Sequence, residues 1–64
     1  MKTQINISEP DDFYDLLLSS HSNLNPIQSA DFNSRLLFLL ANQIGDMNVL
    51  RDCIAAAGLD IKND

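Results

Sequence analysis

The side chains that could carry acid–base, nucleophilic or metal chemistry are few, and their spacing matches no familiar type of site. Three carboxylates, Asp11, Asp12 and Asp15, lie close together. They lack the Asp-x-Asp-x-Asp-Gly loop of a calcium site, and negative charge at that place suits the start of a helix. Cys53 and His21 could pair as nucleophile and base, but no nucleophile elbow or oxyanion loop accompanies them.

The chain holds one cysteine and one histidine. This count excludes an internal disulfide and a structural zinc site, which needs four ligands. A lone cysteine is most often a small buried hydrophobe, so we expect Cys53 to be buried. His21 is expected near a helix C-terminus, where the dipole favours its charged form. We predict no catalytic residue, no metal and no cofactor, and the sequence leaves the roles of His21 and Cys53 open.

Two amides, Asn42 and Gln43, follow the apolar run Leu36–Leu40. Amides in an apolar segment must find hydrogen-bond partners if they are buried. They could bond across to a neighbouring helix, specify the register of an oligomer, or recognise a partner protein directly.

The elements that must position these residues are three predicted helices. Ser8 is the expected N-cap of the first helix, at about 9–21, because a serine side chain accepts from free N–H groups. Asn25 and Gln28 have the spacing of a capping box and predict the start of a longer helix, at about 26–44.

A tight turn at Gly45 and Asp46 is predicted to join the long helix to a short third one. Gly45 should have positive φ, and Asp46 should cap the helix at about 47–57 by accepting from backbone N–H groups. Gly58 is expected to end that helix. The order is therefore helix, turn, long helix, turn, short helix, an all-α unit.

The length and the charge of the chain limit the classes of protein to which it can belong. A chain of 64 residues with net charge −5 makes one domain, 1–64, whose ends at 1–7 and 59–64 are expected to fray. Such a small chain buries only ~60% of its unfolded surface. The acidic balance disfavours nucleic acid and anionic membranes. With no signal peptide and no apolar run of ~18–20 residues, we expect a cytoplasmic protein.

The stretch "LANQIGDMNVLRDCI" imitates a helix-turn-helix motif. Its would-be recognition helix carries Asp46, Arg51 and Asp52, a net acidic set. Readers of DNA need Arg and Lys there for phosphate contacts, so we expect no DNA binding.

The run Leu36–Leu40 is apolar on every side of a helix, because successive residues point about 100° apart. Two shorter helices cannot cover all of it. We therefore predict that the small helical unit is completed by a partner chain, which meets the face of the long helix that includes Phe38. The expected interface residues are Phe38, Leu37, Leu40, Asn42 and Gln43.

The segments "DDFYDLLLSSHSNL" and "QSADFNSRLLFLLANQIGDMNVLRDCIAAA" resemble a family of very short bacterial proteins known as a domain of unknown function. The resemblance spans about residues 9–57, and its sharpest parts are "DDFY", the region that approximates "LLLAN-x-IGD", and "VLR". The family commonly has His where this chain has Gln43, which argues against metal or proton chemistry there. Family members often stand beside flavin-dependent aromatic hydroxylases, so the resemblance implies an accessory role in aromatic degradation.

Two functions from different classes fit these patterns. The first is a non-catalytic interaction protein that dimerises, or acts as an accessory subunit of a larger enzyme such as a flavin-dependent hydroxylase. The alternative is a binding or sensing protein for an aromatic metabolite. Its pocket would be lined by Tyr14, Phe32, Phe38 and Met47.

Overall fold

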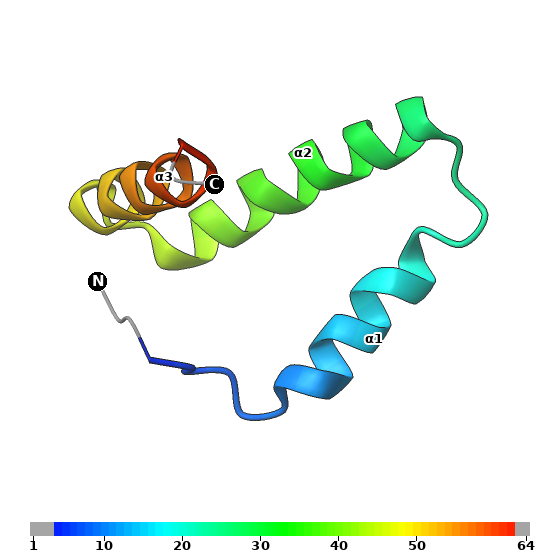
Figure 1. Cartoon of the computed structure of the whole chain (residues 1–64), viewed down its shortest axis with the longest axis horizontal. Coiled ribbons are helices and arrows are strands. Elements are labelled where there is room, and N and C mark those ends of the chain that lie inside the picture. The colour runs from blue at the N-terminus through cyan, green and yellow to red at the C-terminus, as the bar shows by residue number, and fades with distance from the viewer. Residues whose placement is uncertain (1–3, 63–64) are drawn as a thin grey trace. The chain divides into compact units, whose positions relative to one another are not determined.

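A computed structural model describes residues 4–62, and these form three helices: α1 (Pro10–Ser20), α2 (Pro26–Ile44) and α3 (Met47–Lys62) (Figure 1). Residues 4–62 contain no strand, so the all-α prediction is confirmed. These residues divide into two compact units. The N-terminal unit, 4–35, holds α1 and the first part of α2, and the C-terminal unit, 36–62, holds the rest of α2 and α3.

Helix α1 begins at Pro10, and the predicted cap at Ser8 is wrong. The N-cap is Glu9, which has φ −136° and ψ 71° and makes no side-chain capping bond. Proline bars the residue before it from the helical region, so the helix starts at the proline itself. The first intrahelical bond runs from the N–H of Phe13 to the carbonyl of Glu9, at 3.0 Å.

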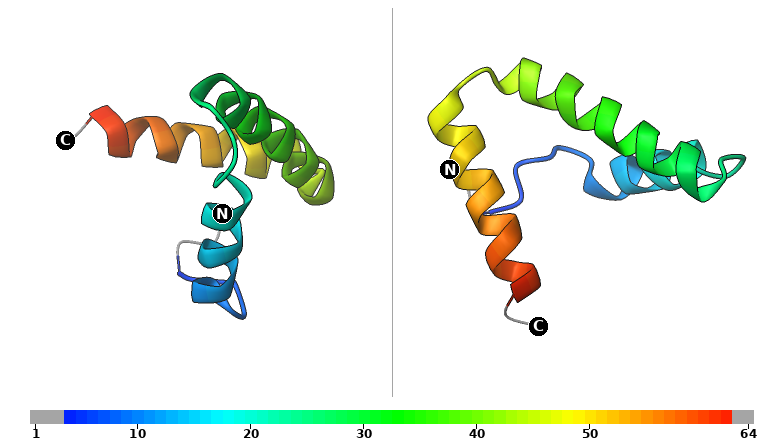
Figure 2. Two further views of the ribbon diagram at one scale, coloured as in Figure 1. Left: turned by 90° about the vertical axis from the view of Figure 1, so that its right-hand side faces the viewer. Right: turned by 90° about the horizontal axis from the view of Figure 1, so that it is seen from above.

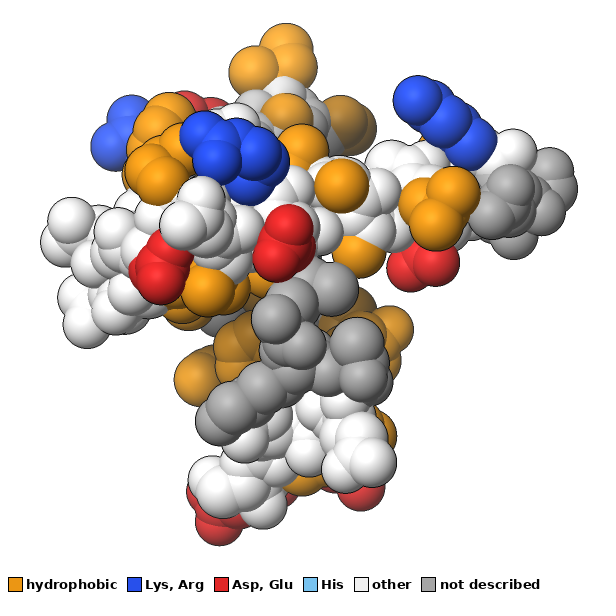
Figure 3. Space-filling view, turned by 90° about the vertical axis from the view of Figure 1, so that its left-hand side faces the viewer, with side chains coloured by type: hydrophobic (Ala, Val, Ile, Leu, Met, Phe, Trp, Pro, Cys, Tyr) orange, Lys and Arg blue, Asp and Glu red, His pale blue; other side chains and the backbone are white. Residues whose placement is uncertain are grey.

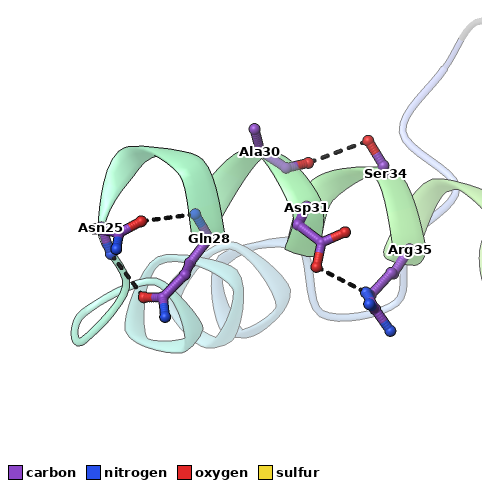
Figure 4. Close-up of polar contacts among 6 residues, drawn as sticks. All are labelled: Asn25, Gln28, Ala30, Asp31, Ser34 and Arg35. Carbon is purple, nitrogen blue, oxygen red and sulfur yellow. Dashed lines mark hydrogen bonds and ion pairs between the residues drawn. The ribbon is translucent and has the colours of Figure 1, made fainter.

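Helix α2 starts with the predicted capping box (Figure 4). The N–H of Gln28 donates to Oδ1 of Asn25 at 2.8 Å, and the N–H of Asn25 donates to Oε1 of Gln28 at 3.1 Å. One turn later Nε of Arg35 donates to Oδ2 of Asp31 at 2.9 Å. Both partners are exposed, so this pair adds only a few tenths of a kcal/mol.

The turn between α2 and α3 has the predicted geometry. Gly45 has φ 74°, and its N–H donates to the carbonyl of Ala41 at 2.8 Å. Oδ1 of Asp46 accepts from the N–H of Asn48 at 2.8 Å and from the N–H of Val49 at 3.3 Å. The roles of Gly45 and Asp46 as structural turn residues are thus confirmed.

Helix α3 continues to Lys62, so the prediction that Gly58 ends it is wrong (Figure 2), and fraying from residue 59 stays a prediction. A glycine inside a helix costs only about 1 kcal/mol relative to alanine, and no proline follows to stop the helix. Lys62 also lies in the last turn, where positive charge suits the helix dipole. Of the other residues in the two predicted frayed ends, 4–7 precede α1 outside any helix, whereas 1–3 and 63–64 lie outside the described residues.

Each unit has a half-buried seam and no fully buried side chain among the described residues. In the N-terminal unit the half-buried residues are Leu17, His21, Leu24, Ser29 and Phe32. In the C-terminal unit they are Leu36, Ala41, Val49, Leu50, Ala56 and Gly58. Large apolar side chains remain at the surface beside both seams.

Candidate interaction surfaces

The face of α2 predicted to meet a partner is exposed within its own unit. Leu37 is 66% exposed, Phe38 77% and Leu40 45%. Asn42 and Gln43, which follow on the next turn, are exposed as well. We call these five residues the α2 face. Their exposure is the geometry that the sequence predicted for an interface, although what binds there is a separate question.

The two amides of the α2 face do not bond across to a neighbouring helix. Because Asn42 and Gln43 are exposed, water can satisfy their side chains in the free chain. The side-chain amides therefore lie next to the apolar part of the face and make no hydrogen bond to the turn or to a helix end. A partner can replace that water with its own polar groups, and each such hydrogen bond would contribute only about 0.5–1.5 kcal/mol net.

His21 has a structural role that the sequence left open. Its Nδ1 lies 2.9 Å from Oγ of Ser29, and its ring meets the ring of Phe32 edge-on, with centroids 4.8 Å apart and planes at 69°. This contact ties the end of α1 to the first part of α2. The imidazole is thus held in place by the Ser29 hydroxyl and the Phe32 ring, and Cys53, the nucleophile considered from the sequence, belongs to the other unit.

Cys53 is exposed, so the prediction that it is a buried hydrophobe is wrong. The acidic residues Asp11 and Asp12 lie in the first turn of α1, which is the position that the helix dipole favours. Residues 4–62 contain no group of three or more His, Cys, Asp or Glu side chains that could hold a metal ion.

The four side chains predicted to line an aromatic-metabolite pocket are divided between the units. Tyr14 and Phe32 belong to the N-terminal unit, whereas Phe38 and Met47 belong to the C-terminal unit. Tyr14, Phe38 and Met47 are exposed, and Phe32 is half-buried against His21. The aromatic pocket therefore stays a prediction.

A different hollow, not foreseen from the sequence, lies at the start of α1. Its volume is about 280 Å³. It is lined by Ile7, Ser8, Glu9, Asp12, Phe13 and Leu16. The apolar lining comes from α1 and from the extended segment before it, and two carboxylates stand at its edge. We call it the α1 hollow. The sequence predicted a frayed start or a short extended arm over residues 1–7, and neither prediction placed Ile7 against the helix.

The extension of α3 creates a second apolar surface that the sequence analysis missed. Met47, Ile54 and Ile61 recur every seven residues, and they are 59%, 73% and 76% exposed. Because seven residues are almost two helical turns, the three side chains lie along one stripe, which we call the α3 stripe. Apolar side chains interleaved with charged ones are visible on the face drawn in Figure 3. The seven-residue spacing between Ile54 and Ile61, which continues past Gly58, is the sequence signal that could have predicted the stripe.

Comparison with known proteins identifies the family. A family model described as "Protein of unknown function (DUF2783)" matches residues 1–58. The chain belongs to this family. The resemblance of residues 9–57 to a domain of unknown function is confirmed at that level, and the link to flavin-dependent hydroxylases stays a prediction. Searches of curated proteins and of solved structures found no match.

None of the helices described in residues 4–62 has the length and apolar character needed to cross a bilayer.

Proposed function

We propose that this chain is a small non-catalytic interaction protein that associates with another polypeptide through the α2 face. The observation that carries the proposal is the exposure of Leu37, Phe38 and Leu40 within their unit. Leu37, Phe38 and Leu40 lie within about one turn of α2, and exposed apolar side chains on a helix are a common docking surface for a second helix. The partner is a second copy of the chain or a larger enzyme to which the chain is an accessory subunit.

The apolar side chains of this face supply only part of the free energy that association requires. Burial of one large apolar side chain contributes ~1.5–3 kcal/mol. Weighted by the exposed fractions of 66%, 77% and 45%, the three apolar residues would contribute about 3–6 kcal/mol. Association costs about 4–15 kcal/mol in lost translation and rotation. The apolar contact alone is therefore too weak for a stable complex, and hydrogen bonds from Asn42 and Gln43 are needed to complete it.

The family resemblance suggests what the larger partner would be. Proteins of this type often stand beside flavin-dependent aromatic hydroxylases, so such a hydroxylase is the first enzyme to test as the partner. In that case the chain serves aromatic degradation without carrying a catalytic group of its own. The presence of Gln43 in place of the common His supports a binding role for this position, because a glutamine side chain cannot act as a general acid or base at neutral pH.

The test compares two variants of α2 in a pull-down from the native host, followed by sedimentation of the purified chain. Phe38→Asp places a carboxylate at the centre of the α2 face, where burial without a partner is costly. Ile27→Asp is the matched control, because Ile27 is 83% exposed on the first turn of the same helix and lies outside the face. We expect the unmodified chain and Ile27→Asp to retain a stoichiometric partner or to dimerise.

Phe38→Asp should lose that association while keeping the helical circular-dichroism spectrum of the unmodified chain. Retention of the same partner by Phe38→Asp would refute the α2 face as the interface. A chain that binds nothing from the host and sediments as a monomer at high concentration would refute the proposed function as a whole.

A further inference from the structure

The α1 hollow combines an apolar lining with strong negative charge. Ile7, Phe13 and Leu16 are 50%, 41% and 67% exposed, so apolar surface is open to a side chain that enters from outside. Glu9 and Asp12 line the same hollow. The sequence from residue 4 to residue 34 contains no Lys or Arg that could neutralise them.

The dipole of α1 does not cancel this charge. The N-terminus of a helix carries roughly half a positive charge. Against it stand the carboxylates of Glu9, Asp11, Asp12 and Asp15, none of which makes an ion pair within residues 4–62. The surroundings of the hollow are therefore negative by several charges, and a positively charged group is attracted there.

The α3 stripe has the complementary character. Arg51 lies three residues before Ile54, on a neighbouring part of the helix surface, and its guanidinium donates to Oδ1 of Asn48 at 3.2 Å, an exposed contact that a carboxylate can replace. Gly58 lies four residues after Ile54 and three before Ile61, on the same side. A Cβ built on Gly58 would meet no atom within 4 Å, so nothing inside the described chain requires a glycine there. A glycine at this place lets another backbone approach the stripe closely.

We propose that the α3 stripe of one copy docks into the α1 hollow of a second copy. Ile54 would enter the apolar lining, and Arg51 would face the carboxylates of Glu9 and Asp12. Gly58 would allow α3 to lie close to the partner's α1. This contact is separate from the α2 face, and it uses residues to which neither the family description nor the proposed function assigns a role.

Charge complementarity within one sequence is the reason to choose a second copy as the occupant. Each chain has one α3 stripe, with a basic residue beside it, and one α1 hollow, with acidic residues beside it. Two copies related by a twofold axis can therefore satisfy both surfaces at once, through two equivalent α1–α3 contacts. The net charge of −5 makes two copies repel each other, so the local pairing of Arg51 with the carboxylates must outweigh that repulsion.

The experiment is a charge-reversal exchange followed by sedimentation equilibrium at low ionic strength. Asp12→Lys and Arg51→Asp are made in separate chains, and each alone should weaken self-association by ~10-fold or more, because like charges then face each other twice. An equimolar mixture of the two variants should restore a heterodimer, since each α1–α3 contact can then pair opposite charges. A chain with both substitutions should again form a homodimer.

Asp11→Lys is the matched control, because Asp11 lies in the same first turn but does not line the hollow. It should lose the same favourable helix-dipole contact while keeping the dimer. Three outcomes would overturn the inference: a monomeric unmodified chain, equal weakening by Asp11→Lys and Asp12→Lys, or no heterodimer in the mixture. Docking of α3 inside its own chain would give this last result.

Two further variants separate this contact from the α2 face. If self-association uses the α1–α3 contact, the α2 face is left for a larger partner, and Phe38→Asp should lose that partner but keep the dimer. A dimer lost in Phe38→Asp but kept in Asp12→Lys would overturn this inference and make the α2 face the surface of self-association. Gly58→Ala should raise helix content and yet weaken the dimer, because the added methyl group obstructs the close approach. A dimer strengthened by Gly58→Ala would count against docking at the stripe.

Discussion

Substitutions at Gly45 can measure the cost of its left-handed backbone apart from any steric clash of the new side chain. Gly45 has φ +74°, and a Cβ placed there would lie 4.0 Å from the nearest atom, the carbonyl oxygen of Asn42. Because that distance is ordinary van der Waals contact, any loss of stability on substitution must come from the left-handed backbone. This conformation costs an L-residue roughly 1–2 kcal/mol.

The series Gly45→Asn, Gly45→Ala and Gly45→Val should therefore destabilise the chain in increasing order. Asparagine tolerates positive φ best among non-glycine residues, and a β-branched side chain tolerates it least. We expect about 1–2 kcal/mol for alanine, less for asparagine and more for valine. For a domain of this size each kcal/mol lowers the melting temperature by about 4–8 °C.

Thermal melts followed by circular dichroism, at one low protein concentration, measure the series. Gly58→Ala is the control, because Gly58 lies inside α3 with open space around its Cβ position and should gain about 1 kcal/mol of helix stability. Equal melting temperatures for Gly45→Ala and the unmodified chain would mean that the left-handed turn is absent in solution. The three-helix reading would then fail at the joint between α2 and α3.

Three other substitutions test the local contacts. Asp46→Ala should cost about 0.5–2 kcal/mol through the lost cap, whereas Asp46→Asn should be nearly neutral, and equal urea midpoints for the two would contradict the capping role. Asn25→Ala should cost about 1 kcal/mol in the same assay, since it removes the Oδ1 that accepts from the backbone N–H of Gln28, while the backbone N–H of residue 25 can still donate to the Gln28 side chain. Ser29→Ala removes the hydroxyl that contacts the part-buried histidine and should cost about 0.5–1.5 kcal/mol; Ser34→Ala, whose hydroxyl bonds a carbonyl of its own helix, should change the melt little.

The helix starts and the central turn could be predicted because their causes are local. Each capping bond at Asn25, Gln28 and Asp46 joins residues no more than three apart, so the residue types and their spacing determine it. Gly45 follows the same logic, since a left-handed residue is needed wherever a helix ends in a tight turn.

The errors arose where two local signals competed. Ser8 and Pro10 both mark a helix start, and the proline decided it, because the restriction on the residue before proline is steric and a serine cap is worth only about 1 kcal/mol. At Gly58 the expected stop signal met a helix that could continue at about 1 kcal/mol. Four more residues in helical conformation then aligned Ile61 with Ile54.

Contacts between elements could not be predicted from the spacing. The His21–Ser29 bond and the contact of His21 with Phe32 depend on how the loop at 21–25 returns the chain, which no short motif specifies. The α1 hollow depends in the same way on where the segment before α1 places Ile7. The exposure of Cys53 shows the reverse case, in which a residue type that is usually buried lies outside the seam of its unit.

Folding and association should be coupled in this protein, and this gives a last prediction. Isolated helices of this length are marginal in water, and each cap adds only about 1 kcal/mol. No described residue is fully buried, while sixteen large apolar side chains are exposed. A stable domain needs about 5–15 kcal/mol, and we expect much of it to come from covering that apolar surface with a second polypeptide.

Mass action then makes the melting temperature depend on protein concentration. If the chain self-associates, a ~100-fold increase in concentration should stabilise the folded state by about 2.7 kcal/mol, which is a rise of roughly 10–20 °C for a domain of this size. Differential scanning calorimetry over this concentration range measures the change in melting temperature. Whichever of Phe38→Asp and Asp12→Lys makes the melting temperature less dependent on concentration identifies the surface that self-associates. A melting temperature that is high and independent of concentration would show that the isolated chain covers its own apolar residues, and it would refute coupling to a second copy. A low melting temperature that rises only on addition of a host protein would keep the coupling and assign it to the α2 face alone.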